Sequence, residues 1–142
     1  MQRKGTARWQ GDLKTGKGVV STDSGVLSHT QYSFSTRFEN GKGTNPEELI
    51  AAAHAGCFTM ALSAQLGNAG LTPETLETTA TLSFEKQEPG WTVTGIRLDV
   101  KGKVPKADQA AWDKATQAAK TGCPISRLLN TVITMDAKLE SS

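Results

Sequence analysis

The segment at residues 45–70 constrains the fold of this chain more than any other. After Asn45 and Pro46 it has two acids, Glu47 and Glu48, and then 18 residues, 49–66, that carry no formal charge. Asn45 suits an N-cap, Pro46 suits the first helical position, and the acids fall in the first turn, where the helix dipole favours negative charge. The segment therefore predicts a long, well-capped helix with Cys57 at its centre.

The composition of this helix indicates where it lies. The charge-free run is long enough to cross a membrane, but few of its side chains are strongly apolar, and most of the rest are Ala, Gly, Ser, Thr or Gln. A helix that is apolar on most sides and rich in small residues is typical of a protein interior. We therefore expect an almost wholly buried central helix and no membrane partner.

Strand patterns flank the helix on both sides. Before it, three runs read as antiparallel strands, and the last of them, YSFSTRFE, alternates aromatic and polar residues. After it, two long strands are joined by the turn EPG, and a helix over about 106–120, a short helix in CPISRLLN and a final strand follow. This order predicts a single α+β domain over residues 1–142, with antiparallel sheets wrapped around a long central helix.

Charge and cysteine content narrow the function. Sixteen basic and 14 acidic residues are scattered along the chain and give a net charge of +2, which is no footprint for nucleic acid. The basic start MQRKG precedes no apolar run, so we expect a cytoplasmic protein without a signal peptide. Two cysteines and two histidines match no zinc spacing, and we expect no metal or cofactor. Because a structural disulfide is not expected in the cytoplasm, the thiols are either unreactive and buried or a redox pair.

Four segments carry a family resemblance that covers essentially the whole chain: WQGDLKTGKGVVSTDSGVL, YSFSTRFE, GTNPEELIAAAHAGC and AKTGCPISRLL. They resemble the superfamily of osmotically inducible protein C and the organic hydroperoxide resistance proteins, and the N-terminal third resembles the former branch more. The resemblance implies a thiol peroxidase of the stress response that reduces hydroperoxides, organic ones above all. It also implies an intertwined homodimer with active sites at the subunit interface.

The same resemblance implies roles for individual residues. Cys57 matches the peroxidatic cysteine and Cys123 the resolving cysteine, so the pair is expected to form a disulfide during turnover. Glu47 matches a glutamate that orients an arginine, and Arg37 in STRFE matches that arginine. Arg8 is a weaker candidate, because the sibling branch takes its arginine from nearer the N-terminus.

The chemistry of peroxide reduction explains these residue types. A thiolate attacks oxygen, an alkoxide leaves, and a sulfenic acid remains that a second thiol traps. Burial alone would raise the pKa of the thiol, so a nearby cation is needed. Arg37 could serve the sulfur and the leaving oxygen with one edge of its guanidinium and bind Glu47 with the other.

Helix geometry limits how Glu47 can reach this site. Ten residues of helix span about 15 Å, and at 100° per residue Glu47 and Cys57 differ by about 80° around the axis. Two alternatives follow: a break near residues 53–56, or a Glu47 supplied by the partner subunit.

Other side chains have a functional and a structural interpretation. His54, one turn before Cys57, could act as a base and would then suggest acyl chemistry, but nearby Asp or Asn to orient it is lacking, and structural packing is favoured. Eight apolar residues could line a hydrocarbon pocket, although ordinary core packing is the simpler interpretation: Phe58, Met60, Ala61, Leu62, Trp112, Ile125, Leu128 and Leu129.

Two further functions remain open from the sequence. The first is a hot-dog-like acyl thioesterase or acyl-binding protein with non-catalytic cysteines, and the second is a non-enzymatic stress protein with inert thiols. A peroxidase would also need a small-molecule hydroperoxide substrate and a thiol reductant, for which the sibling branch suggests a lipoylated protein.

Overall fold

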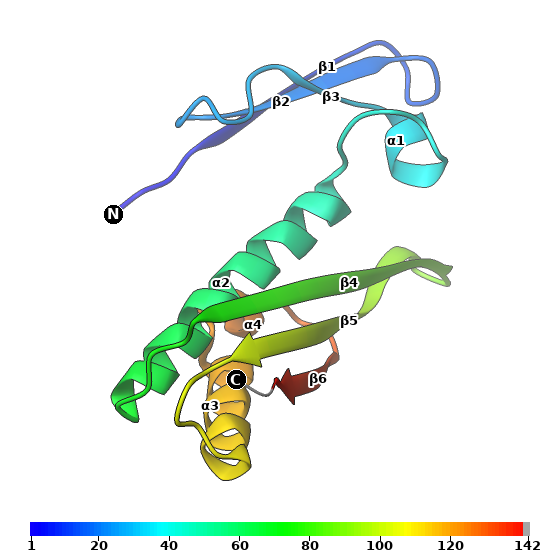
Figure 1. Ribbon diagram of the computed structural model, residues 1–142. Coiled ribbons are helices and arrows are strands. Elements are labelled where there is room, and N and C mark those ends of the chain that lie inside the picture. The colour runs from blue at the N-terminus through cyan, green and yellow to red at the C-terminus, as the bar shows by residue number, and fades with distance from the viewer. Residues whose placement is uncertain (141–142) are drawn as a thin grey trace. The chain divides into compact units, whose positions relative to one another are not determined.

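The computed structural model describes residues 1–140 and divides into two compact units, residues 1–49 and residues 50–142. Figure 1 shows the order of the elements along the chain. The first unit holds β1 (Gly5–Gln10), β2 (Lys17–Thr22), β3 (Thr30–Tyr32) and α1 (Phe34–Phe38). The second holds β4 (Thr75–Gln87), β5 (Gly90–Lys103), α3 (Gln109–Gly122), α4 (Pro124–Leu128) and β6 (Ile133–Leu139). Helix α2 (Pro46–Asn68) begins in the first unit and continues into the second.

The first unit is built on a small antiparallel sheet, as predicted. Its strand order is β1-β2-β3, with Ala7 opposite Val20 and Val19 opposite Gln31. Trp9 of β1 packs against Tyr32 of β3, with ring centroids 5.6 Å apart. No side chain other than hydrogen fits at Gly18, because a Cβ there would collide with both rings.

The predicted strand in YSFSTRFE is wrong, because most of this segment forms α1. Ser33 caps the helix: its hydroxyl accepts from the backbone N–H of Thr36 at 3.2 Å, and the Thr36 hydroxyl accepts from the N–H of Ser33 at 2.8 Å. This reciprocal cap satisfies two backbone donors at once. It outweighs the strand-like alternation of aromatic residues and places Arg37 in the last helical turn.

Helix α2 starts as predicted but is less buried than predicted. Asn45 Oδ1 accepts from the N–H of Glu48 at 2.7 Å, which caps the helix, while the Glu48 carboxylate accepts from the Thr44 hydroxyl. By length and composition α2 could cross a membrane, a test that the core helix of a soluble protein also passes. Only its face through Phe58 and Leu62 is fully buried, and the opposite, charge-free face is exposed in this chain.

The second unit places helices against one face of a three-stranded sheet. Strands β4 and β5 form a long antiparallel hairpin, and β6 pairs with β5 in parallel, so the sheet is not antiparallel throughout. Parallel neighbours need a long crossover, and the segment that contains α3 and α4 provides it. The core lies between the helices and this sheet, with Phe58 and Leu66 from α2, Leu98 from β5 and Trp112 from α3 all fully buried.

Candidate active site

The two cysteines lie in direct contact in the second unit. Cys57 Sγ and Cys123 Sγ are 2.7 Å apart, and both thiols are free. Cys123 is fully buried and Cys57 is partly exposed. A disulfide bond measures about 2.05 Å, so the sulfurs need to approach by less than about 1 Å to be joined. The structure thus brings together two residues that the sequence separates by 66 positions.

Local structure explains how Cys123 reaches this place. It ends α3 through a hydrogen bond from its N–H to the carbonyl of Ala119, and its own carbonyl accepts from the N–H of Arg127 in α4. Pro124 occupies the first turn of α4, where the missing N–H costs nothing. The chain therefore turns sharply at Cys123 and presents its side chain toward α2.

The environment of Cys57 in this unit keeps the thiol protonated. Burial raises the pKa of the Cys57 thiol, and its hydrogen bond with the Cys123 thiol raises it further, with a smaller contribution from charge repulsion between the two sulfurs. The backbone N–H of Ile125, in the first turn of α4, opposes this shift by favouring the thiolate. Cys57 therefore rests as a neutral thiol and needs an additional positive charge for attack at neutral pH.

His54 lies one turn before Cys57 and is fully buried. Its Nε2 lies 2.7 Å from the hydroxyl of Ser126 in α4, and burial lowers the pKa of its imidazole. Within the described residues its Nδ1 has no hydrogen-bond partner. The ring is therefore neutral and tied to α4, which agrees with the predicted packing role.

The first unit contains the second predicted pair, Arg37 and Glu47. Arg37 Nε and Nη2 donate to the two carboxylate oxygens of Glu47 at 2.8 and 3.1 Å, a bidentate ion pair. Asn45 brings these residues together, because its Nδ2 donates to the carbonyl of Thr36 in α1 while its Oδ1 caps α2. Glu47 is the more buried partner, with 12% of its side chain exposed against 39% for Arg37. The predicted association of arginine and glutamate is present.

An aromatic pocket next to Arg37 was not identified from the sequence. It measures about 260 Å³ and is lined by Trp9, Leu13, Tyr32, Ser33, Phe34, Arg37 and Phe38. The clustering of three aromatics at residues 32–38 is the available signal, but the strand prediction places Arg37 on the face opposite Tyr32 and Phe34. In the structure the Phe34 and Phe38 rings pack 5.0 Å apart on one face of α1.

Other predicted residues have different surroundings. Among the proposed pocket walls, Phe58, Leu62 and Trp112 are fully buried core, whereas Met60 and Leu128 are largely exposed. The remaining three, Ala61, Ile125 and Leu129, pack against the core. The weaker candidate, Arg8, is an exposed residue of β1 that lines a shallow hollow with His29, while Arg37 is the arginine that binds Glu47.

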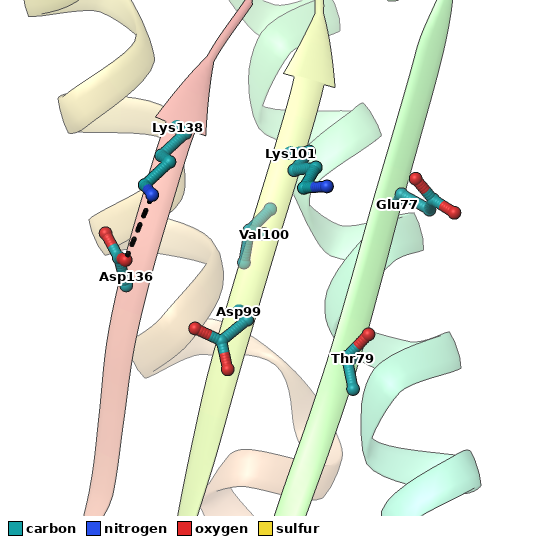
Figure 2. Close-up of a pocket in the computed structure, with 7 residues that line it drawn as sticks. All are labelled: Glu77, Thr79, Asp99, Val100, Lys101, Asp136 and Lys138. Atoms are coloured by element: carbon teal, nitrogen blue, oxygen red, sulfur yellow. Dashed lines mark ion pairs between the residues drawn. The ribbon is translucent and has the colours of Figure 1, made fainter.

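A second hollow, on the outer face of the β4-β5-β6 sheet, is lined mostly by charged residues (Figure 2). It is lined by Glu77, Thr79, Asp99, Val100, Lys101, Asp136 and Lys138, and Lys138 Nζ lies 3.9 Å from Asp136 Oδ2. No thiol lines it, and the ion pair between Lys138 and Asp136 lies within the single strand β6. We interpret it as a solvated sheet face. Within residues 1–140, three or more His, Cys, Asp or Glu side chains do not gather as a metal site would require.

Comparison with known proteins connects these features. The family model for OsmC-like proteins matches residues 39–138. Peroxiredoxin OsmC of Escherichia coli (strain K12) is 52% identical over 141 residues, 99% of both chains. Organic hydroperoxide resistance protein OhrB of Bacillus subtilis (strain 168) is 32% identical over 125 residues, 87% of this chain and 88% of OhrB.

Solved structures confirm the predicted α+β fold with its long central helix. The crystal structure of Bacillus subtilis OhrB matches with a TM-score of 0.70 at 25% identity and covers 99% of this chain and 98% of that one. The OsmC-like protein VCA0330 of Vibrio cholerae matches with a TM-score of 0.79 at 15% identity, over 97% of this chain and 99% of that one, and shows the fold alone. The resemblance seen in the sequence is confirmed: this chain belongs to the family of OsmC-like proteins.

Proposed function

We propose that this protein is a thiol peroxidase that reduces organic hydroperoxides, with Cys57 as the peroxidatic and Cys123 as the resolving cysteine. The observation that carries the proposal is the 2.7 Å contact between their sulfurs, with one thiol buried and the other partly exposed. The names of the relatives, a peroxiredoxin and organic hydroperoxide resistance proteins, point to the same activity. A hot-dog-like thioesterase would have no use for this contact.

The reaction proceeds in two balanced steps. The Cys57 thiolate attacks the outer oxygen of ROOH, the O–O bond breaks, and the alkoxide takes a proton to leave as ROH while Cys57 becomes a sulfenic acid. The sulfur of Cys123 then attacks Cys57, the S–OH bond breaks, and hydroxide leaves as water with the proton of Cys123. A thiol reductant returns the disulfide to two thiols, and the lipoylated protein suggested by the sibling branch remains our candidate.

Arg37, held in place by Glu47, supplies the positive charge that the thiol pair lacks. A guanidinium beside the sulfur would counter the burial that raises the pKa of Cys57 and would stabilise the departing alkoxide. The bidentate bond to Glu47 fixes the plane of the guanidinium, and its other edge would face the substrate. The aromatic pocket beside Arg37 would hold the organic group of the substrate.

We propose that this charge comes from a partner subunit in an intertwined homodimer. Helix α2 is helical at every residue from Pro46 to Asn68, which supports this alternative over a break near residues 53–56. The exposed face of α2 carries Ala53, Gly56 and Met60, and a charge-free face of this length is suited to burial against a second copy. We place the protein in the cytoplasm, as predicted.

A thiol titration tests the chemistry. Free thiols are counted before and after one equivalent of cumene hydroperoxide, in the wild type and in the Cys57→Ser and Cys123→Ser variants. The peroxidase loses both thiols, and dithiothreitol restores them; Cys57→Ser does not react. Retention of both thiols would instead identify an inert protein, and acyl-ester hydrolysis that survives both substitutions would identify the thioesterase.

The role of Arg37 is tested by rate. Arg37→Met should slow the first step about 100-fold, the usual effect of removing one donor from a developing oxyanion. Its rate should recover as the pH rises, because the Cys57 thiolate then forms without help. Arg97→Met is the matched control, since Arg97 is also paired with an acid, Asp99, but lies on the outer sheet face. Equal losses in both variants would remove Arg37 from the mechanism.

Mixing inactive subunits tests whether the arginine acts across the dimer. Arg37→Met and Cys57→Ser chains are unfolded together, refolded and assayed. If the arginine comes from the partner, each mixed dimer has one complete site, and activity returns to about one quarter of the wild-type value. If the arginine and thiol act within one chain, the mixture stays inactive.

A further inference from the structure

Two side-chain contacts, one turn apart, join α2 in the second unit to α4 and to Cys123, the residue directly before α4. The first is the contact between Cys57 and Cys123, and the second is the 2.7 Å hydrogen bond between His54 Nε2 and Ser126 Oγ. Both pairs have the same spacing: His54 precedes Cys57 by three residues, and Ser126 follows Cys123 by three. We propose that His54 and Ser126 are positioning residues that hold Cys123 against Cys57 for disulfide formation. The inference rests on the proposed peroxidase function.

The short helix α4 needs such an anchor. It has five residues, Pro124–Leu128, and Leu128 at its end is 73% exposed. Its hydrogen bonds to other backbone groups, such as Arg127 N–H to the carbonyl of Cys123, lie within the turn, and the backbone N–H of Ile125 meets α2 at the reacting Cys57 thiol itself. Ser126 is the residue of α4 whose side-chain hydroxyl reaches α2 away from that thiol, and it is 9% exposed.

The burial of this hydrogen bond indicates which of its two atoms is the donor. His54 is fully buried, and a lone pair left unpaired costs less there than an unpaired N–H. Since Nδ1 has no partner among the described residues, the proton belongs on Nε2, which donates to Ser126 Oγ. In a buried site, this bond is stronger than at the surface. Its loss would leave Nε2 of His54 without a hydrogen-bond partner within residues 1–140, in addition to Nδ1.

The anchor matters most after the first chemical step. When Cys57 becomes a sulfenic acid, an oxygen is bonded to its sulfur, and the contact between the two thiols of the resting protein no longer exists in the same form. Two reactions then compete for the sulfenic acid: attack by Cys123, which forms the disulfide and releases water, and attack on a second hydroperoxide, which gives a sulfinic acid and alcohol. A fixed α4 keeps Cys123 within reach and favours the disulfide, since orientation determines the rate of an intramolecular step.

A peroxide-free measurement tests the anchor by itself. The protein is equilibrated with mixtures of reduced glutathione and glutathione disulfide, and the effective concentration of the two thiols is obtained from the fraction with the Cys57–Cys123 disulfide. Ser126→Ala should lower it about tenfold, the factor that corresponds to about 1.4 kcal/mol. His54→Leu should lower it similarly, and His54→Gln, whose amide N–H can replace Nε2–H, should restore most of it.

Thr116→Val is the matched control, because it also removes a nearly buried hydroxyl hydrogen bond, to the carbonyl of Asp113 in α3. It should leave the effective concentration unchanged. If Ser126→Ala and His54→Leu fold, as circular dichroism reports, and both match the wild type, the positioning role is excluded. Equal losses in Thr116→Val would show general destabilisation and also exclude it.

A single-turnover experiment with cumene hydroperoxide connects the anchor to the reaction. Ser126→Ala should consume hydroperoxide in the first step at the wild-type rate, form the disulfide about tenfold more slowly, and accumulate Cys57 sulfinic acid, as measured by mass spectrometry. A wild-type protein that does not reduce the hydroperoxide would contradict the proposed function and leave the glutathione result standing. Wild-type disulfide rates in the variant would contradict the inference alone.

Discussion

Oxidation of the two thiols should stabilise the folded protein strongly. The disulfide closes a loop across 66 positions of the sequence. By the chain-entropy relation, a cross-link over a loop of this length removes about 4 kcal/mol of conformational freedom from the unfolded state. The full effect is expected only if the native state accepts the bond without strain. The sulfurs are already 2.7 Å apart, so we expect most of it to be realised.

The experiment compares four samples by urea unfolding, followed by circular dichroism. The wild type is measured once under a reductant and once after one equivalent of cumene hydroperoxide, with the linkage verified on peptides by mass spectrometry. Cys57→Ser/Cys123→Ser, treated both ways, controls for other effects of the oxidant. The oxidised wild type should unfold at a higher urea concentration and melt on the order of 10 °C higher.

One result would refute this reasoning. Suppose that the disulfide-linked protein is no more stable than the reduced one. The strain that the disulfide causes in the folded state must then cancel the stabilisation that comes from restricting the unfolded state. The segment that carries Cys123 would then have to move to form the disulfide, and the resting contact would not represent the geometry of the oxidised protein. The same result would weaken the case for a fixed α4.

Two further changes test the packing and the titration of this unit. Gly102→Ala should destabilise the protein by about 1–3 kcal/mol in urea unfolding, because its Cβ would overlap the Trp112 ring; Gly122→Ala, with no neighbour within 4 Å, is the control. Stability should also fall with acid below about pH 6.5, because burial lowers the pKa of folded His54 and the unfolded state then binds the proton more tightly. His54→Gln should reduce the dependence of the unfolding free energy on pH in this range. An unchanged dependence would show that other groups cause it.

Local signals in the sequence identify the main helices and strands, but they do not show which surfaces of these elements are buried by other parts of the protein. The start of α2 was predictable because Asn45 and the acids act on the nearest backbone groups. The extent of its burial was not predictable, because an apolar helix surface looks the same whether this chain or another copy covers it. The failure at α1 has a different origin. Alternation favoured a strand, while the reciprocal bonds of Ser33 and Thr36 decided for a helix.

In the candidate site, too, the sequence identified residues but not their contacts. The identity of Cys57, Cys123, Arg37 and Glu47 came from family motifs, and the structure added which of them touch. Contacts over 66 and 72 positions, such as those that join α2 to α4, depend on the sheet and on the crossover that returns the chain through α3. No spacing rule on the sequence reports them. His54 therefore looked like an isolated histidine, although it has a specific partner.

The two units carry complementary halves of the proposed chemistry. Residues 50–142 hold a thiol pair whose surroundings raise the pKa of Cys57, and residues 1–49 hold a guanidinium fixed by a carboxylate beside an aromatic pocket. A thiol that stays neutral in its own unit is protected from unwanted oxidation, because the thiolate is the reactive form. In the proposed mechanism, reactivity would then depend on an arginine that reaches the thiol together with the organic group of the substrate. This would restrict the chemistry to hydroperoxides that occupy the aromatic pocket and contact Cys57 at the same time.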